Sequence, residues 1–132
     1  MIHVSALSKE AEQVLETMLK VVERYQEGER KNLTIDCEEF NKYINPEAMG
    51  PFYDEQAIVE SIDFCKHHEF PLLPLLLVIS EDFRRPENKI LMESYGSKPF
   101  KELSRCWKQS LKKIENLDDS TITEMYKTMD LA

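Results

Sequence analysis

The chain has 132 residues, of which 42% are hydrophobic and 32% are charged, and its formal net charge is −8. This length fits one folded domain with one core, and the composition excludes a disordered chain. We therefore predict a single domain over residues 1–132, with a core unit at 33–107 and a helical extension at 108–132.

The charge is sorted along the chain. Residues 1–63 hold 6 Lys/Arg against 14 Asp/Glu, a balance of −8. Residues 64–117 hold 10 against 7, a balance of +3, and residues 118–132 hold 1 against 4, a balance of −3. An acidic balance repels nucleic acid and anionic membranes overall and favours basic partners, but it leaves room for a local basic stripe.

Targeting and redox features indicate a cytoplasmic chain. Residues 1–7 lack the basic and then apolar pattern of a signal peptide, and the apolar stretch at 70–79 is too short and proline-broken to span a bilayer. The three cysteines, Cys37, Cys65 and Cys106, are odd in number and lack metal-knuckle spacing. We expect buried reduced thiols and no membrane partner.

The first predicted element is an amphipathic helix over residues 9–27. Ser8 suits its N-cap and Gly28 its end. Its apolar stripe recurs at three- and four-residue steps and consists of Ala11, Val14, Leu15, Met18, Val22 and Tyr25. Opposite that stripe, at 100° per residue, four glutamates fall within about 60° of one another: Glu12, Glu16, Glu23 and Glu27.

Short elements are predicted for the middle of the chain. An extended piece at 33–35 precedes a short helix that Asp36 caps and that runs to about Ile44, where the Asn45-Pro46 pair is expected to stop it. A turn at 49–51 then leads into a helix at 53–68. Because prolines exclude helix at 71–74, residues 75–79 are predicted as a strand. A polar loop at 80–88, with Arg84 and Arg85 at its tip, would connect it to a second strand at 89–95, ending at Gly96.

Two helices are predicted for the rest of the chain. Pro99 suits the start of a helix that reaches about Leu117. Its inner face is expected to hold Phe100, Leu103, Trp107, Leu111 and Ile114. Its far side gathers four cations within about 60°: Lys101, Arg105, Lys108 and Lys112.

A capping box, Thr121-x-x-Glu124, is expected to open the last helix. Its apolar face, Ile122, Met125, Tyr126 and Met129, either covers the core or docks a partner. The whole chain is thus predicted as α+β, mostly helical with about five helices and a small β-hairpin, in a winged-helix-like order.

The core positions resemble a small winged-helix-like domain of phage and restriction-associated bacterial proteins. The resemblance covers about residues 33–107 and rests on Leu33-Thr34-Ile35, Phe40, Ile44, Gly50, residues 58–62, the run 65–78 around Pro71, Arg85-Pro86 and Trp107. It implies a mobile-element setting and a winged-helix-like core, and it carries no catalytic residues.

The chain departs from a DNA reader of that kind. The helix in the recognition position carries four acids against one Lys66, namely Asp54, Glu55, Glu60 and Asp63. A groove-reading helix is polar and basic on its exposed face. We therefore predict that major-groove reading has been lost.

Catalytic motifs do not support an enzyme. Glu87-Asn88-Lys89 lacks a further carboxylate a strand away for a Mg²⁺ site, and Cys65 lies on an apolar stripe before His67 and His68. With 3 glycines in the chain, no glycine-rich phosphate loop can form. We expect no enzyme activity, no metal and no cofactor.

Three functions are compatible with these faces. The first is an acidic, non-enzymatic phage or mobile-element protein that inhibits or modulates a nucleic-acid-handling enzyme, as anti-CRISPR and anti-restriction proteins do, with the acidic stripe on a basic protein surface. The second is a nucleic-acid-binding module that uses the basic helix with Arg84 and Arg85. The third is a homodimeric assembly module whose stripes pair. Ordinary solvation of an outer helix face also explains each stripe.

Overall fold

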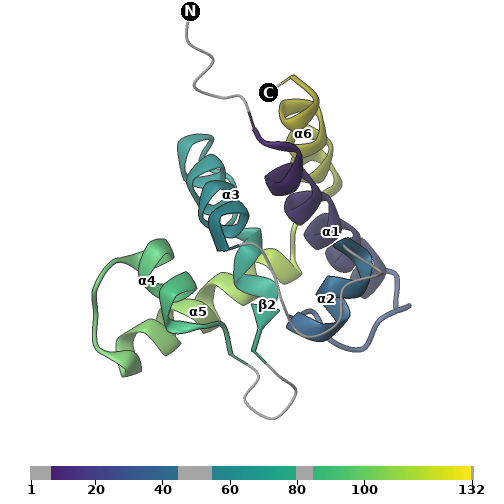
Figure 1. Cartoon of the computed structure of the whole chain (residues 1–132). Helices are drawn as coiled ribbons and strands as arrows, with labels where there is room; N and C mark the ends of the chain where they lie inside the picture. Colours follow the sequence, from purple (N-terminus) through teal and green to yellow (C-terminus); the bar gives the residue numbers. More distant parts are fainter. Residues whose placement is uncertain (1–6, 45–54, 80–84, 132) are drawn as a thin grey trace, which may run out of the picture.

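The computed structural model describes residues 7–44, 55–79 and 85–131 (Figure 1). Its elements in chain order are α1 (Lys9–Gln26), β1 (Ile35–Asp36), α2 (Cys37–Ile44), α3 (Glu55–His67), the 3₁₀ helix η1 (Leu73–Leu76), β2 (Leu77–Val78), α4 (Asn88–Tyr95), α5 (Phe100–Glu115) and α6 (Asp119–Leu131). The prediction of a mostly helical α+β chain is confirmed, with six α-helices in the described residues instead of about five.

Helix α1 lies at the centre of the fold and contacts α2, α3, η1, α5 and α6. Its apolar stripe is buried as predicted, except that Tyr25 is only half-buried. The Ser8 hydroxyl accepts a hydrogen bond from the Ala11 amide at 3.1 Å, which confirms the N-cap. Gly28, with φ of 79°, follows the helix in the left-handed region that favours glycine.

The two short strands pair in parallel, not as a hairpin. Ile35 lies opposite Leu77, and Asp36 lies opposite Val78. A parallel pair needs a crossover connection, which α2, α3 and η1 supply here. The predicted β-hairpin between 75–79 and 89–95 is therefore wrong.

The segment predicted as the second strand is helix α4. It buries Ile90, Leu91 and Ser94, a spacing that a helix places on one face. Gly96, with φ of 86°, ends the helix, and its amide donates to the Met92 carbonyl at 2.7 Å. An apolar run of this length fits both a strand and a helix, which is why periodicity alone misassigned it.

The proline-containing run also differs from the prediction. Strand β2 begins only at Leu77, because residues 73–76 form η1 with Pro74 in its first turn. A proline is tolerated there because the first turn of a helix needs no amide donor from it. The Ile79 amide donates to the Arg85 carbonyl at 2.9 Å, which closes the loop after β2.

The C-terminal helices close the core. In α5, Leu103 and Ile114 are buried and the Trp107 indole donates to the Leu75 carbonyl at 2.8 Å. Phe100 was expected to point inward, but it is 53% exposed. The predicted apolar face of α6 covers the core, since Ile122, Met125 and Met129 are buried.

The start of α6 was placed too late in the sequence. The helix begins at Asp119, and the Asp118 carboxylate accepts from the Thr121 amide at 2.7 Å, so Asp118 is the cap and the Thr121 capping box is wrong. The predicted stop at 45–46, the turn at 49–51, Gly50, Asp54 and Arg84 lie outside the described residues. Within the described residues, no helix combines the length and apolarity needed to cross a membrane.

Candidate binding surfaces

The acidic stripe of α1 lies beside α6. Glu12, Glu16 and Glu23 are half-buried, and only Glu27 is exposed. The Tyr126 hydroxyl donates a hydrogen bond to the Glu23 carboxylate at 2.9 Å. Because α6 runs antiparallel to α1, it also brings Asp130 near Glu16 (Figure 1). Part of the predicted contact surface is therefore part of the fold.

Like charges crowd this seam between α1 and α6. Burial raises the pKa of Glu16 above its ordinary value, and the neighbouring Glu12 and Asp130 raise it further, while Lys20 opposes the shift. Burial and the bond to Glu23 likewise raise the pKa of the Tyr126 hydroxyl. These directions indicate that the Glu16 carboxyl and the Tyr126 hydroxyl are partly removed from solvent, unlike groups on a fully solvated helix face.

The basic stripe of α5 is exposed along its whole length. Among the described residues, none of its four cations has a carboxylate within ion-pair distance. The nearest ion pair on this helix, at 3.8 Å, joins the Lys98 ammonium to Glu102. The members of this basic face are Lys101, Arg105, Lys108 and Lys112.

An aromatic ring and a further arginine lie where α5 begins. The Arg85 guanidinium lies 5.2 Å from the centroid of the exposed Phe100 ring, within the range of a cation–π contact. It also donates to the Asn88 side chain at 3.1 Å. Arg85 therefore lies beside the first residue of α5, and its membership of a larger basic patch with the helix stripe stays a prediction.

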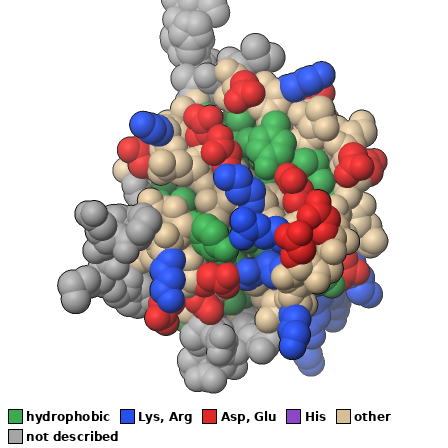
Figure 2. All heavy atoms as spheres, turned by 90° about the vertical axis from the view of Figure 1, so that its right-hand side faces the viewer, with side chains coloured by type: hydrophobic (Ala, Val, Ile, Leu, Met, Phe, Trp, Pro, Cys, Tyr) green, Lys and Arg blue, Asp and Glu red, His purple; other side chains and the backbone are tan. Residues whose placement is uncertain are grey.

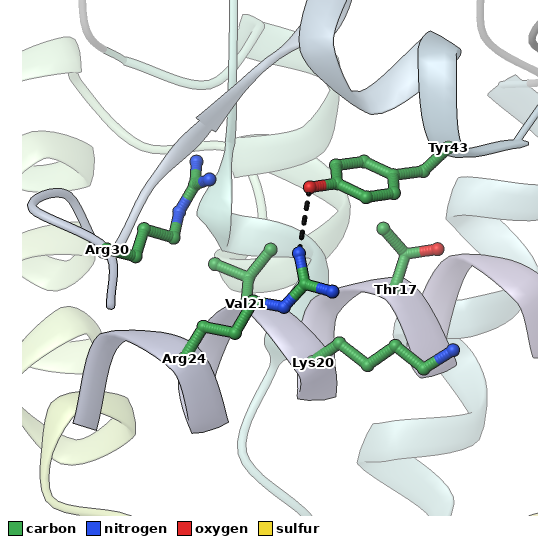
Figure 3. Close-up of a pocket in the computed structure, with 6 residues that line it drawn as sticks. All are labelled: Thr17, Lys20, Val21, Arg24, Arg30 and Tyr43. Carbon is green, nitrogen blue, oxygen red and sulfur yellow. Dashed lines mark hydrogen bonds between the residues drawn. The ribbon is translucent and has the colours of Figure 1, made fainter. Parts of the chain in front are cut away.

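A pocket between α1 and α2 was not anticipated. It encloses about 90 Å³ and is lined by Thr17, Lys20, Val21, Arg24, Arg30 and Tyr43 (Figure 3). In the close-up, Arg24 reaches toward the Tyr43 hydroxyl and donates to it at 3.1 Å. Figure 2 shows a band of Lys and Arg side chains across this face of the molecule, with acidic side chains on both sides. We call this feature the α1–α2 pocket.

Arg30 has a structural role at the edge of that pocket. Its two terminal nitrogens donate to the Glu39 carboxylate at 2.7 and 2.9 Å, and the group also donates to the carbonyls of Asn32 and Thr34. This bidentate pair lowers the pKa of Glu39 and raises that of Arg30. The pair fastens α2 to the loop after α1.

The sequence contained part of the signal for the pocket. Lys20 and Arg24 are four residues apart, so they share a face at the edge of the acidic stripe. Tyr43 and Arg30 come from other elements, and only the packing of α2 against α1 brings them there. The prediction of an acidic stripe on α1 did not consider Lys20 and Arg24 as a possible binding site.

The remaining motif residues form ordinary structural contacts. Glu87-Asn88-Lys89 opens α4, and the Lys89 ammonium pairs with Glu55 at 3.0 Å on the surface. In the part of the chain that the structure describes, no group of three or more His, Cys, Asp or Glu side chains could hold a metal ion.

All three cysteines are free thiols. Burial raises the pKa of Cys65 to about 12 and that of Cys37 to about 11. Both thiols are therefore protonated at neutral pH, which makes them poor nucleophiles. Cys37 and Cys65 are buried as predicted, whereas Cys106 is half-buried.

Comparison with known proteins gives no relative from which a function could be transferred. The chain matches no protein-family model, no curated protein and no solved structure. The function must be argued from the surfaces described above.

Proposed function

We propose that this protein is a non-enzymatic binding protein that holds a nucleic-acid backbone through the basic face of α5. The observation that carries the proposal is the set of four exposed cations without a carboxylate partner among the described residues, in a chain of net charge −8. The chain has 25 acidic residues that could neutralise these cations. Because none of the described ones forms an ion pair with the basic face, the face is suited to an external anionic ligand.

The dimensions of the basic face fit a polyanion. Lys101 and Lys112 are eleven residues apart, which is about 16 Å along a helix. One strand of DNA carries a phosphate for roughly every 3.4 Å of axis, so the face spans several phosphates. Contacts of this kind position a backbone and carry no sequence information. The acids Glu55 and Asp63 on the exposed side of α3 support binding without groove reading.

The winged-helix-like core and the mobile-element setting remain part of this proposal. They are supported by the resemblance of the core positions, together with the order of α2, α3 and β2. The parallel β1–β2 pair counts against a conventional wing, because a wing is an antiparallel hairpin. Phosphate contacts by α5 do not depend on a wing.

A salt series tests the proposal. Binding to double- and single-stranded DNA oligonucleotides should weaken about 100-fold between 50 and 200 mM salt if four phosphates are contacted. The double variant Arg105→Glu/Lys108→Glu should abolish binding. Lys127→Glu, an exposed charge reversal on α6, is the matched control and should retain most of the binding. No binding at low salt, or equal losses in both variants, would contradict the proposal.

A second candidate is a protein that inhibits or modulates a nucleic-acid-handling enzyme through its acidic side. It is favoured by the crowding of Glu12, Glu16 and Asp130, because a basic partner surface would relieve that repulsion. Mixing with basic nuclease complexes over a range of salt concentrations tests it. Salt-sensitive binding that Glu12→Gln/Glu16→Gln weakens would support this candidate, and unchanged binding would remove it.

Pairing of the acidic and basic stripes across a homodimer is the third proposal. The acidic surface available for such a dimer contact is smaller than the sequence predicted, because α6 lies beside the acidic stripe. Light scattering at low and high salt decides it. A monomer mass under both conditions would exclude this arrangement.

A further inference from the structure

The α1–α2 pocket presents hydrogen-bond donors that no acceptor in the described part of the chain uses. Arg24 donates one N–H to the Tyr43 hydroxyl oxygen, and among the residues that the structure describes, its other N–H groups and the Tyr43 proton have no acceptor. In the described part of the chain, no carboxylate lies within ion-pair distance of the Lys20 ammonium. Lys20, Arg24 and Tyr43 thus line one pocket; in Figure 3 Arg24 and Tyr43 point toward each other, whereas the flexible Lys20 side chain extends away from them along α1.

The pocket also carries a defined charge. Arg30 is neutralised by its bidentate pair with Glu39, so the other cations of the lining are Lys20, which also interacts at longer range with Glu16, and Arg24. The Thr17 hydroxyl donates to the Gln13 carbonyl at 2.7 Å and so adds no donor. Buried Val21 completes the lining.

We propose that the α1–α2 pocket binds the phosphate group of a small phosphate monoester through Lys20, Arg24 and the Tyr43 hydroxyl. Such a group carries a charge of about −1.5 to −2 at neutral pH and offers three strong acceptor oxygens, which matches the charge and the donors of the pocket. Arginine is well suited to phosphate because its planar fork donates two parallel bonds.

The size of the pocket limits the ligand. Its volume of about 90 Å³ is smaller than the cavity of roughly 150 Å³ that holds a benzene ring in an engineered protein. A phosphate group fits, and the rest of the molecule would remain outside on the surface. The pocket therefore selects the phosphate end of a ligand.

The surroundings disfavour a nucleic-acid backbone at this pocket. Acidic side chains flank the basic band on both sides in Figure 2, so a chain of phosphates crossing this face would run over carboxylates. A single phosphate avoids them by entering the pocket. This site is on α1 and α2 and is independent of the basic face of α5.

A nuclear magnetic resonance titration of the whole ¹⁵N-labelled protein tests the inference. The probes are inorganic phosphate and phenyl phosphate, with sodium chloride added to keep the ionic strength constant. Saturable shifts are expected at Lys20, Arg24 and Tyr43. Each of Lys20→Gln and Arg24→Gln should weaken binding about 10-fold or more, the usual effect of losing one charge-assisted hydrogen bond.

Two further variants separate binding from folding. Lys127→Gln removes the same charge from an exposed position of α6, outside both proposed sites, and should leave the affinity for phosphate unchanged. Tyr43→Phe retains the ring and removes only the hydroxyl; it should weaken binding about fivefold while the unfolding midpoint stays the same. Shifts that do not saturate, shifts confined to α5, or an equal loss in Lys127→Gln would each overturn the inference, whatever the outcome with DNA.

Discussion

Helices α1 and α5 are built on the same plan but use their charged faces differently. Each has a stripe of one sign opposite its apolar stripe. On α1 the glutamates lie beside α6, and Glu23 accepts a hydrogen bond from Tyr126. On α5 all four cations are exposed. A stripe of one sign therefore does not by itself mark a binding surface, because a later helix can pack beside it.

The difference extends to the roles of single charges. On the α1 side charged groups act within the fold: Arg30 pairs with Glu39, and Glu16 lies among other acids. On α5 the cations contribute little to the fold, since exposed charges are worth near zero to stability. Substitutions should therefore change stability on the α1 side and leave it unchanged on the basic face.

The largest effect is expected when the docking of α6 is weakened. Met125 is completely buried, so Met125→Ala should lower the free energy of unfolding by about 2–5 kcal/mol. Lys127→Ala, at an exposed position of the same helix, should change it by less than about 0.5 kcal/mol. Urea denaturation followed by circular dichroism measures both. Equal small effects would mean that α6 leaves the acidic stripe open, and the contrast with α5 would fail.

The next effect concerns the Arg30–Glu39 pair. Arg30→Ala removes four donated hydrogen bonds and should cost about 2 kcal/mol, a figure held down because the Glu39 side chain is 37% exposed. Arg30→Lys keeps the charge but not the fork, so it should recover less than half of that loss. Full recovery by lysine would show that charge alone acts here.

A smaller effect is expected at the seam itself. Tyr126→Phe removes the hydroxyl that donates to Glu23 and should cost about 1 kcal/mol, since a half-buried acceptor loses its partner. Tyr43→Phe, at the more exposed tyrosine of the α1–α2 pocket, is the matched control and should cost less than about 0.5 kcal/mol. Thermal unfolding of the two variants gives the comparison, and a smaller loss for Tyr126→Phe would reverse it.

The sequence predicted α1, α5 and the short helix α2, but it misassigned α4 and η1 as strands, for a physical reason. Over α1 and α5 the helical period repeats several times, so core and outer faces can be assigned. Over the eight residues of α4 the helical period repeats only about twice, and the positions of Ile90 and Leu91 fit a strand equally well. The local caps Ser8 and Asp36 were predictable because a cap bonds to an amide only three residues away.

The candidate sites divide in the same way. The basic face of α5 was predictable because all of its members belong to one helix. The covering of the acidic stripe was not, since Tyr126 and Glu23 are 103 residues apart. The α1–α2 pocket likewise needs Tyr43 against Arg24, 19 residues away, and helical periodicity within one element cannot supply such a contact.

The smallest effect gives the most direct comparison of the two stripes, because it neutralises one charge on each. The fold raises the pKa of Glu16 above its ordinary 4.5, so the folded state holds that proton more tightly than the unfolded state. Wild-type stability should therefore fall as the pH rises from the ordinary pKa through the raised one. Glu16→Gln carries no ionisable group there and avoids that loss.

Glu16→Gln should thus match the wild type near pH 4 and exceed it at pH 7 by up to about 0.5 kcal/mol, with a smaller gain in high salt. Lys108→Gln on the basic face should show no pH-dependent difference over the same range, because among the described residues no carboxylate lies within ion-pair distance of this exposed side chain. Urea midpoints of both variants at the two pH values decide the matter. If the two responses were the same, the acidic stripe would be as open to solvent as the basic face, and the proposal of an acidic contact surface would regain its full extent.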